Sequence, residues 1–147
     1  MKYNFSISPY IDVSQKNKLS QNKQAGARKK PERVEGTLSC ELPKTLVNKN
    51  DIHITSKRNF DCFQDTELDM LLKRTLNVKN IIICGVNTDT CVYGTTFGAS
   101  NRGYNPIVIE CCTGSMRGED QHKTALKIMS QSIAWVMKKE EILNKLN

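Results

Sequence analysis

Apolar and polar positions divide the chain from about residue 51 onward into short strands and helices. Residues 51–55 alternate apolar and polar, which predicts a strand. Residues 66–76 place four leucines on one stripe, which predicts a helix. The continuous apolar run 81–84 predicts a strand covered on both faces. A helix is then expected from Cys91 to Asn101, closed by Gly103.

The same alternation continues to the C-terminus. We expect a strand at 107–109, a helix at 119–133, a strand at 134–137 and a short helix at 138–146. Strands that alternate with helices predict right-handed βαβ units and a mostly parallel sheet. The expected fold is therefore α/β, a Rossmann-like three-layer α/β/α sandwich.

The first third of the chain has a different composition. The formal net charge is +7, and residues 1–50 carry ten Lys and Arg against four Asp and Glu. Residues 14–33 contain seven basic residues and only three apolar ones, too few to bury a core. We therefore expect residues 1–33 to be a basic, disordered segment and residues 34–147 to be the folded domain. A nucleic-acid patch is the alternative, but the segment lacks interleaved aromatics, so nucleic-acid binding is not expected.

Several classes of protein are excluded by the composition. No run of eighteen apolar residues occurs, so no membrane span is expected. The N-terminus does not resemble a secretory signal, which predicts a cytoplasmic protein with reduced thiols. The six cysteines form no CxxC pair, and the two histidines lie far apart in the sequence, so no metal site is predicted.

Cys91 is the candidate nucleophile. It follows the strand 81–84 after a turn with good capping residues, so it is expected at the start of the next helix. Unpaired N–H groups and the positive helix end there favour a reactive thiolate and an oxyanion. A small core cysteine is the alternative. Lys57 follows the strand 51–55 and is a candidate to lie beside this thiolate, the alternative being an ordinary solvent-exposed lysine.

Five stretches of the chain match motifs of a known family. They are residues 35–42, 57–68, 84–92, 95–103 and 114–122. On these stretches the chain, from Val34 onward, resembles the isochorismatase-like cysteine hydrolases, and in particular ureidoacrylate amidohydrolase and N-carbamoylsarcosine amidase. The resemblance covers about three quarters of the chain, and its motifs occur in the family's order.

This resemblance implies an Asp–Lys–Cys triad without cofactor or metal. Cys91 matches the nucleophile and Lys57 the lysine. The backbone N–H groups of Asn87 and Cys91 match the oxyanion hole, which the family forms with a cis peptide, here Val86–Asn87. The implied reaction is hydrolysis of an amide or ureide C–N bond in a small molecule, through a thioester at Cys91.

The triad Asp is the departure from the family. The family places it after an apolar first strand, and the only nearby candidate is Asp12, in a weakly alternating segment that contains Pro9. We therefore expect the first strand region to be missing and proton transfer to be impaired. The alternative is a non-catalytic paralogue or gene fragment that acts as an oligomer partner. A missing strand would expose a sheet edge, so a homo-oligomer is expected.

Aromatic residues near these motifs are candidates for a substrate wall. Phe63 and Tyr93 are the two that we assign to substrate binding, with core packing as the alternative. His122, near the start of a predicted helix, is interpreted as a surface or capping residue.

Overall fold

The chain forms two compact units, residues 1–58 and 59–147, and each is described by itself. In none of the described residues does a helix have the length and apolar character needed to cross a membrane. The computed structural model describes residues 5–7, 38, 42, 44–48 and 50–146.

The first unit contains a two-stranded parallel sheet. Strand β1 (Phe5–Ile7) pairs with β2 (Ile52–Ile54), with Phe5 opposite Ile52 and Ile7 opposite Ile54. The sequence predicts a disordered segment 1–33 and a missing first strand region, and β1 is a strand of three residues within that segment. The boundary between a disordered segment 1–33 and a folded domain 34–147 stays a prediction. Strand β1 has only three residues and ends two positions before Pro9. A segment this short carries no hydrophobic pattern from which a strand could be predicted. The basic segment 14–33 lies outside the described residues.

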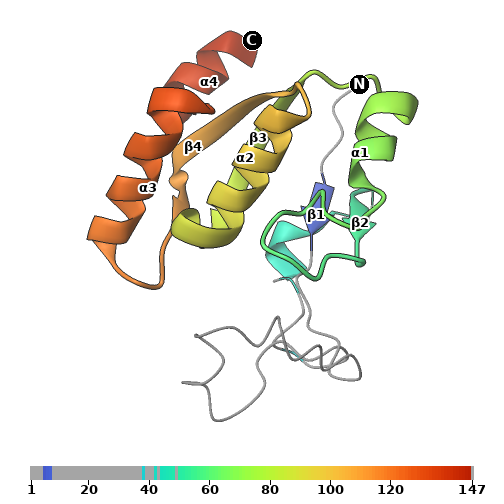
Figure 1. The fold of residues 1–147 in the computed structure, drawn as a ribbon, viewed down its shortest axis with the longest axis horizontal. Coiled ribbons are helices and arrows are strands. Elements are labelled where there is room, and N and C mark those ends of the chain that lie inside the picture. Colours follow the sequence, from blue (N-terminus) through green and yellow to red (C-terminus); the bar gives the residue numbers. More distant parts are fainter. Residues whose placement is uncertain (1–4, 8–37, 39–41, 43, 49, 147) are drawn as a thin grey trace. The chain divides into compact units, whose positions relative to one another are not determined.

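The second unit is built on a three-stranded parallel sheet. Its order is β3 (Asn80–Val86), β4 (Asn105–Gly114) and β5 (Trp135–Met137). Figure 1 shows β3 and β4 running side by side behind the helices. Helix α1 (Leu68–Met70) precedes the sheet and continues as one π-helical turn, Leu71–Thr75.

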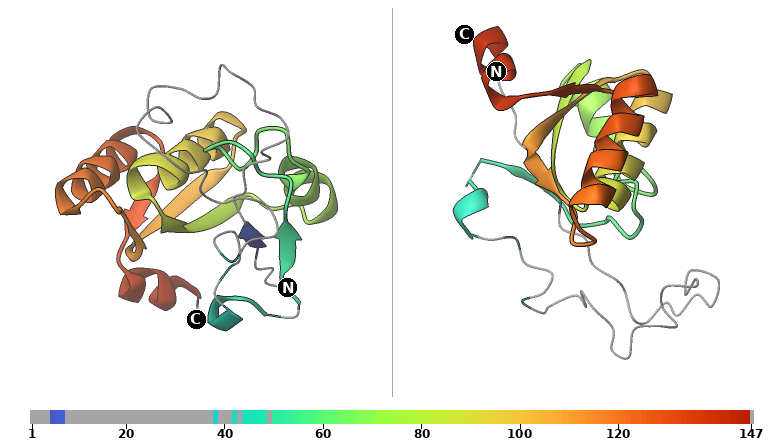
Figure 2. Two further views of the ribbon diagram at one scale, coloured as in Figure 1. Left: turned by 90° about the horizontal axis from the view of Figure 1, so that it is seen from below. Right: turned by 90° about the vertical axis from the view of Figure 1, so that its left-hand side faces the viewer.

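Helices cover this sheet on both faces. Helices α2 (Tyr93–Asn101) and α3 (Glu119–Ser132) lie on one face, and α4 (Lys139–Leu146) lies on the other, as the two views of Figure 2 show. This parallel sheet with helices on both faces is the α/β sandwich that the sequence predicted.

The two faces of this sheet are not equally covered. Ile83 lies opposite Val108, and both are buried, at 7% and 0% exposed. The next row, which points to the other face, contains Ile82 at 43% exposed and Trp135 at 69% exposed. The expectation that the strand 81–84 is covered on both faces was therefore wrong, because in the described part of the second unit α4 is the only helix on that face.

Thr66 and Gly103 lie at the ends of two helices of the second unit. The Oγ1 of Thr66 accepts a hydrogen bond from the N–H of Leu68 (3.3 Å), so this hydroxyl satisfies a free donor where α1 begins. Gly103 follows α2 with φ +81°, the left-handed conformation that ends many helices. Gly103 closes its helix as the sequence predicted, and the N-cap position of α1 is occupied by Glu67.

Candidate active site

Cys91 lies between a strand and a helix of the second unit. It is part of one π-helical turn, Thr88–Val92, which follows β3 and leads directly into α2. Asn87 has an extended backbone (φ −94°, ψ 144°) and turns the chain from the strand into this turn. The Cys91 side chain is half-buried. Single π-helical turns are frequent at functional sites, and the positive end of the helix favours negative charge nearby.

The peptide bond between Val86 and Asn87 is cis. The family resemblance implied this bond, and the structure confirms it. Gly85, just before it, has φ +127°, which favours glycine. The convergence of the Asn87 and Cys91 N–H groups on one oxyanion stays a prediction.

A second loop, between β4 and α3, fastens the turn that carries Cys91. The N–H of Met116 donates to Oδ1 of Asn87 (2.9 Å). The Oγ1 of Thr88, which is fully buried, is hydrogen-bonded to Nδ1 of His122 (2.8 Å). Because Asn87 and Thr88 are adjacent to each other and begin the turn, these two contacts fix where it starts.

Asp89 makes the third attachment between the two loops. Its carboxylate accepts hydrogen bonds from Oγ of Ser115 and from the guanidinium of Arg117, each at 2.6 Å. Burial by itself would raise the pKa of Asp89, but the hydrogen bonds from Ser115 and Arg117 outweigh it and hold that pKa below its usual value. Asp89 is therefore a fixed negative charge two residues from Cys91.

Sequence reasoning missed this arrangement. His122 was interpreted as a surface or capping residue, and Ser115 and Arg117 were given no role. A signal was available, since the segment 115–122, a loop and the first turn of α3, follows β4, the neighbour of β3. The carboxyl ends of adjacent parallel strands meet at one edge of a sheet, so loops that follow such strands are brought together.

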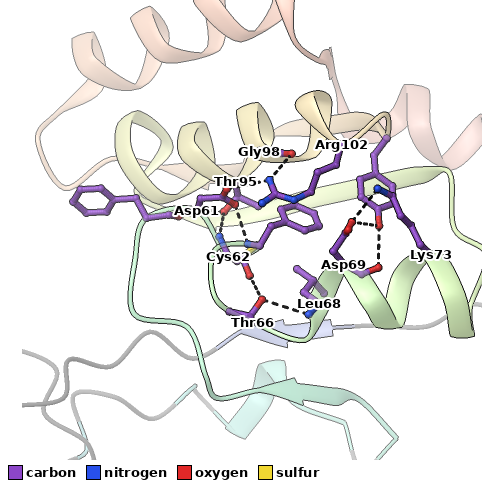
Figure 3. A network of polar contacts seen from close by, with 12 residues as sticks. Asp61, Cys62, Thr66, Leu68, Asp69, Lys73, Thr95, Gly98 and Arg102 are labelled. Atoms are coloured by element: carbon purple, nitrogen blue, oxygen red, sulfur yellow. Dashed lines mark hydrogen bonds and ion pairs between the residues drawn. The ribbon is translucent and has the colours of Figure 1, made fainter. Parts of the chain in front are cut away.

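The segment just before α1 is attached to α2 (Figure 3). Asp61 forms an ion pair with Arg102 (3.3 Å), and Arg102 also donates to the carbonyl of Gly98 (2.9 Å). The N–H of Cys62 donates to Oγ1 of Thr95 (3.3 Å). A side chain at Gly98 would collide with the Asp61 carboxylate, so this approach depends on glycine.

The two aromatic residues assigned to substrate binding have different surroundings. Phe63 is 4% exposed and stacks on Tyr104 (5.5 Å between centroids), with the guanidinium of Arg102 over its ring. These are contacts of a core side chain, the alternative given above. Tyr93 is half-buried, two residues from Cys91, and stacks on Phe97 (6.5 Å). A role of either residue in substrate binding stays a prediction.

The remaining triad candidates belong to the first unit. Lys57 lies three residues beyond β2 and is buried, at 6% exposed. Asp12 lies outside the described residues. The pairing of Lys57 with Cys91 therefore stays a prediction. In the described part of the chain, no group of three His, Cys, Asp or Glu side chains could hold a metal ion.

The family is decided by a comparison with protein-family models. The isochorismatase domain model matches residues 9–141. The chain belongs to the isochorismatase family. The protein is 33% identical over 97 residues to the uncharacterized isochorismatase family protein YecD of Escherichia coli O157:H7, covering 66% of this chain and 50% of YecD. It is 28% identical to YwoC of Bacillus subtilis, covering 71% and 54% of the two chains. This isochorismatase-family protein thus spans about half the length of these curated relatives.

Solved structures of the family share its fold. An isochorismatase-like hydrolase from Alkaliphilus metalliredigens superposes with a TM-score of 0.82 at 23% identity, over 99% of this chain and 74% of that one. The nicotinamidase SaPncA from Staphylococcus aureus is 30% identical, with a TM-score of 0.65 over 71% and 69% of the two chains.

Proposed function

We propose that this protein is a cysteine-dependent hydrolase that cleaves the C–N bond of a small amide or ureide through a thioester on Cys91. The observation that carries the proposal is the fixed π-helical turn. Cys91 is held at the start of α2, and side chains of Asn87, Thr88 and Asp89 each make a hydrogen bond to the neighbouring loop. A nucleophile must be held in place to attack, and such positioning lowers the entropic part of the barrier.

The proposed reaction has two steps. The Cys91 thiolate attacks the carbonyl carbon, the C–N bond breaks, and the departing nitrogen takes a proton. Water then attacks the thioester, which releases a carboxylic or carbamic acid and restores the thiol. The backbone N–H groups of Asn87 and Cys91 are assigned to the oxyanion.

Lys57 is assigned as the cation beside the thiolate because it matches the lysine of the family's triad in the sequence. It follows β2 by three residues and is buried. A lysine beside the thiolate would stabilise it and polarise the carbonyl.

Asp12 is the proposed proton acceptor. It follows β1 by five residues in the sequence, and Lys57 follows β2 by three. Because β1 and β2 are parallel, their carboxyl ends meet at one edge, the place where α/β sheets bind ligands. General acid–base catalysis typically accelerates a reaction by about 10²–10⁴-fold, so removing the proton acceptor would lower the turnover rate measurably.

The substrate class is proposed from the sequence resemblance and from the relatives. The motifs resemble ureide and carbamoyl amidases, while SaPncA, at 30% identity, is a nicotinamidase. A panel of ureides, N-carbamoyl amino acids and nicotinamide therefore covers both chemistries. A cytoplasmic location and a homo-oligomer stay predictions from the sequence.

The test is turnover on this panel by the full chain, measured as release of ammonia or amine. We expect slow hydrolysis that is lost in Cys91→Ala, falls at least tenfold in Lys57→Met and in Asp12→Asn, and is unchanged in the control Cys111→Ala. Hydrolysis that survives Cys91→Ala would refute the proposed nucleophile. No turnover on any member of the panel by a folded chain would favour the non-catalytic alternative.

A further inference from the structure

Three thiols outside the proposed active site lie together on the sheet of the second unit. Cys84 is on β3, while Cys111 and Cys112 are on β4, and all three are exposed. The sulfur atoms of Cys111 and Cys112 are 4.0 Å apart. The proposed hydrolysis uses none of these thiols.

An irregularity in strand pairing creates this cluster. Ile83 pairs with Val108, and Gly85 pairs with Thr113. Four residues of β4, 109–112, therefore lie opposite a single residue of β3, Cys84. Cys84 and Cys112 each precede a member of the pair Gly85–Thr113 by one position. Neighbouring strands lie about 4.8 Å apart, which falls within the Cα separation of about 4.4–6.8 Å that disulfides need.

The protonation equilibria show the same proximity. Partial burial of its thiol, together with the neighbouring Cys112 and Cys111, raises the pKa of Cys84 to about 11. Burial and the Cys111 thiol also raise the pKa of Cys112, although Cys84 and Lys139 act in the opposite direction. Cys112 therefore disfavours the thiolate of Cys84, whereas Cys84 favours the thiolate of Cys112, so the two thiols interact and Cys112 is the one whose thiolate its neighbour stabilises.

We propose that Cys84 and Cys112 are a dithiol pair that forms a reversible disulfide when it meets a small-molecule disulfide such as oxidised glutathione. The bond would tie β3 to β4 two residues before the Val86–Asn87 peptide and three residues before Ser115. Both loops of the proposed active site thus begin just beyond it.

The exchange balances in two steps. The Cys112 thiolate attacks one sulfur of the small disulfide, which forms a mixed disulfide and expels one thiolate. The Cys84 thiolate then attacks the Cys112 sulfur and expels the second thiolate. The protein loses two hydrogens and two electrons, and the small disulfide gains both as two thiols. Once Cys112 is in the mixed disulfide, its charge no longer opposes ionisation of Cys84.

Two other uses of the cluster fit less well. A Cys111–Cys112 disulfide would close a ring across one peptide bond, and its two Cα atoms are fixed about 3.8 Å apart, below the usual range. The three thiols lack the arrangement needed for a metal ion, as no metal-binding group occurs among the described residues.

The test places the full chain at low concentration in glutathione buffers of increasing oxidised fraction, with quenching by a thiol-alkylating reagent. Trypsin cuts after Lys79, Arg102 and Arg117, so Cys84 lies in peptide 80–102 and Cys112 in peptide 103–117. We expect an intramolecular link between these peptides in the monomer, with loss of two hydrogens, which disappears on reduction.

Single-residue variants identify the two cysteines that form the disulfide. Cys84→Ser and Cys112→Ser should each abolish it, while Cys111→Ser and Cys91→Ser should retain it. Circular dichroism of the reduced variants checks that each is folded. Glutathione adducts without a link, a bond within peptide 103–117, a link that needs Cys91 or Cys111, or a link between two chains would each overturn the proposal. These readouts do not use turnover, so they are independent of the proposed function.

Discussion

Replacing Arg117 by Gln tests how the loop that carries Cys91 is held. Arg117 contacts Asp89 at 2.6 Å, and the Asp89 side chain is only 9% exposed. A hydrogen bond to a charged group typically contributes about 1.5–3 kcal/mol, and a surface ion pair about 0–1 kcal/mol. The Arg117 side chain is 42% exposed, so solvent screening lowers its share. We expect the variant to lose about 1 kcal/mol of unfolding free energy at pH 6.

The assay is urea unfolding followed by circular dichroism, with Lys123→Gln as the matched control. Lys123 forms an exposed ion pair with Glu119 (3.2 Å), both side chains being more than two-thirds exposed, so its loss should cost under about 0.5 kcal/mol. A double-mutant cycle with Asp89→Asn should give a coupling energy of about 1 kcal/mol. If Arg117→Gln costs no more than the control and the coupling is zero, the ion pair does not hold this loop.

The pH dependence gives an independent check with a fixed sign. The folded-state pKa of Asp89 lies below its ordinary value of about 3.9. Its stabilising contribution is therefore fully present above about pH 4 and is lost as the pH falls through the lowered pKa. The difference between the wild type and Arg117→Gln should shrink between pH 6 and pH 3. A difference that grows on acidification would contradict the assignment.

Three further predictions concern the same elements. Gly98→Ala places a Cβ within 2.6 Å of the Asp61 carboxyl carbon and should cost about 1–3 kcal/mol in urea unfolding. Thr88→Val removes a fully buried hydroxyl from its histidine partner on α3 and should cost about 1–2 kcal/mol by the same assay. With its pKa raised to about 11, Cys84 should react with iodoacetamide at pH 8 well after Cys91, as peptide mapping would show.

The sequence predicted most of the second unit because its elements carry strong local signals. The run at residues 81–84, the leucine stripe of 66–76 and Gly103 each act within a few residues of chain. The cis bond at Val86–Asn87 came from the family resemblance and was confirmed.

The features that were missed depend on contacts between distant residues. Strand β1 is held by pairing with β2, more than forty residues away, and its own pattern is weak. The bond between Thr88 and His122 and the exposure of Ile82 depend on which loops and helices pack together. Local periodicity carries no information about such partners.

The central claim is that Cys91 forms a thioester with the acyl group of an amide or ureide. Rapid quenching of the full chain with an activated acyl ester, followed by digestion and mass spectrometry, measures this most directly. The account predicts an acyl group on peptide 80–102 that is absent in Cys91→Ala and retained in Cys84→Ala. Acylation that persists in Cys91→Ala, or that is confined to another cysteine in the folded wild type, would contradict it.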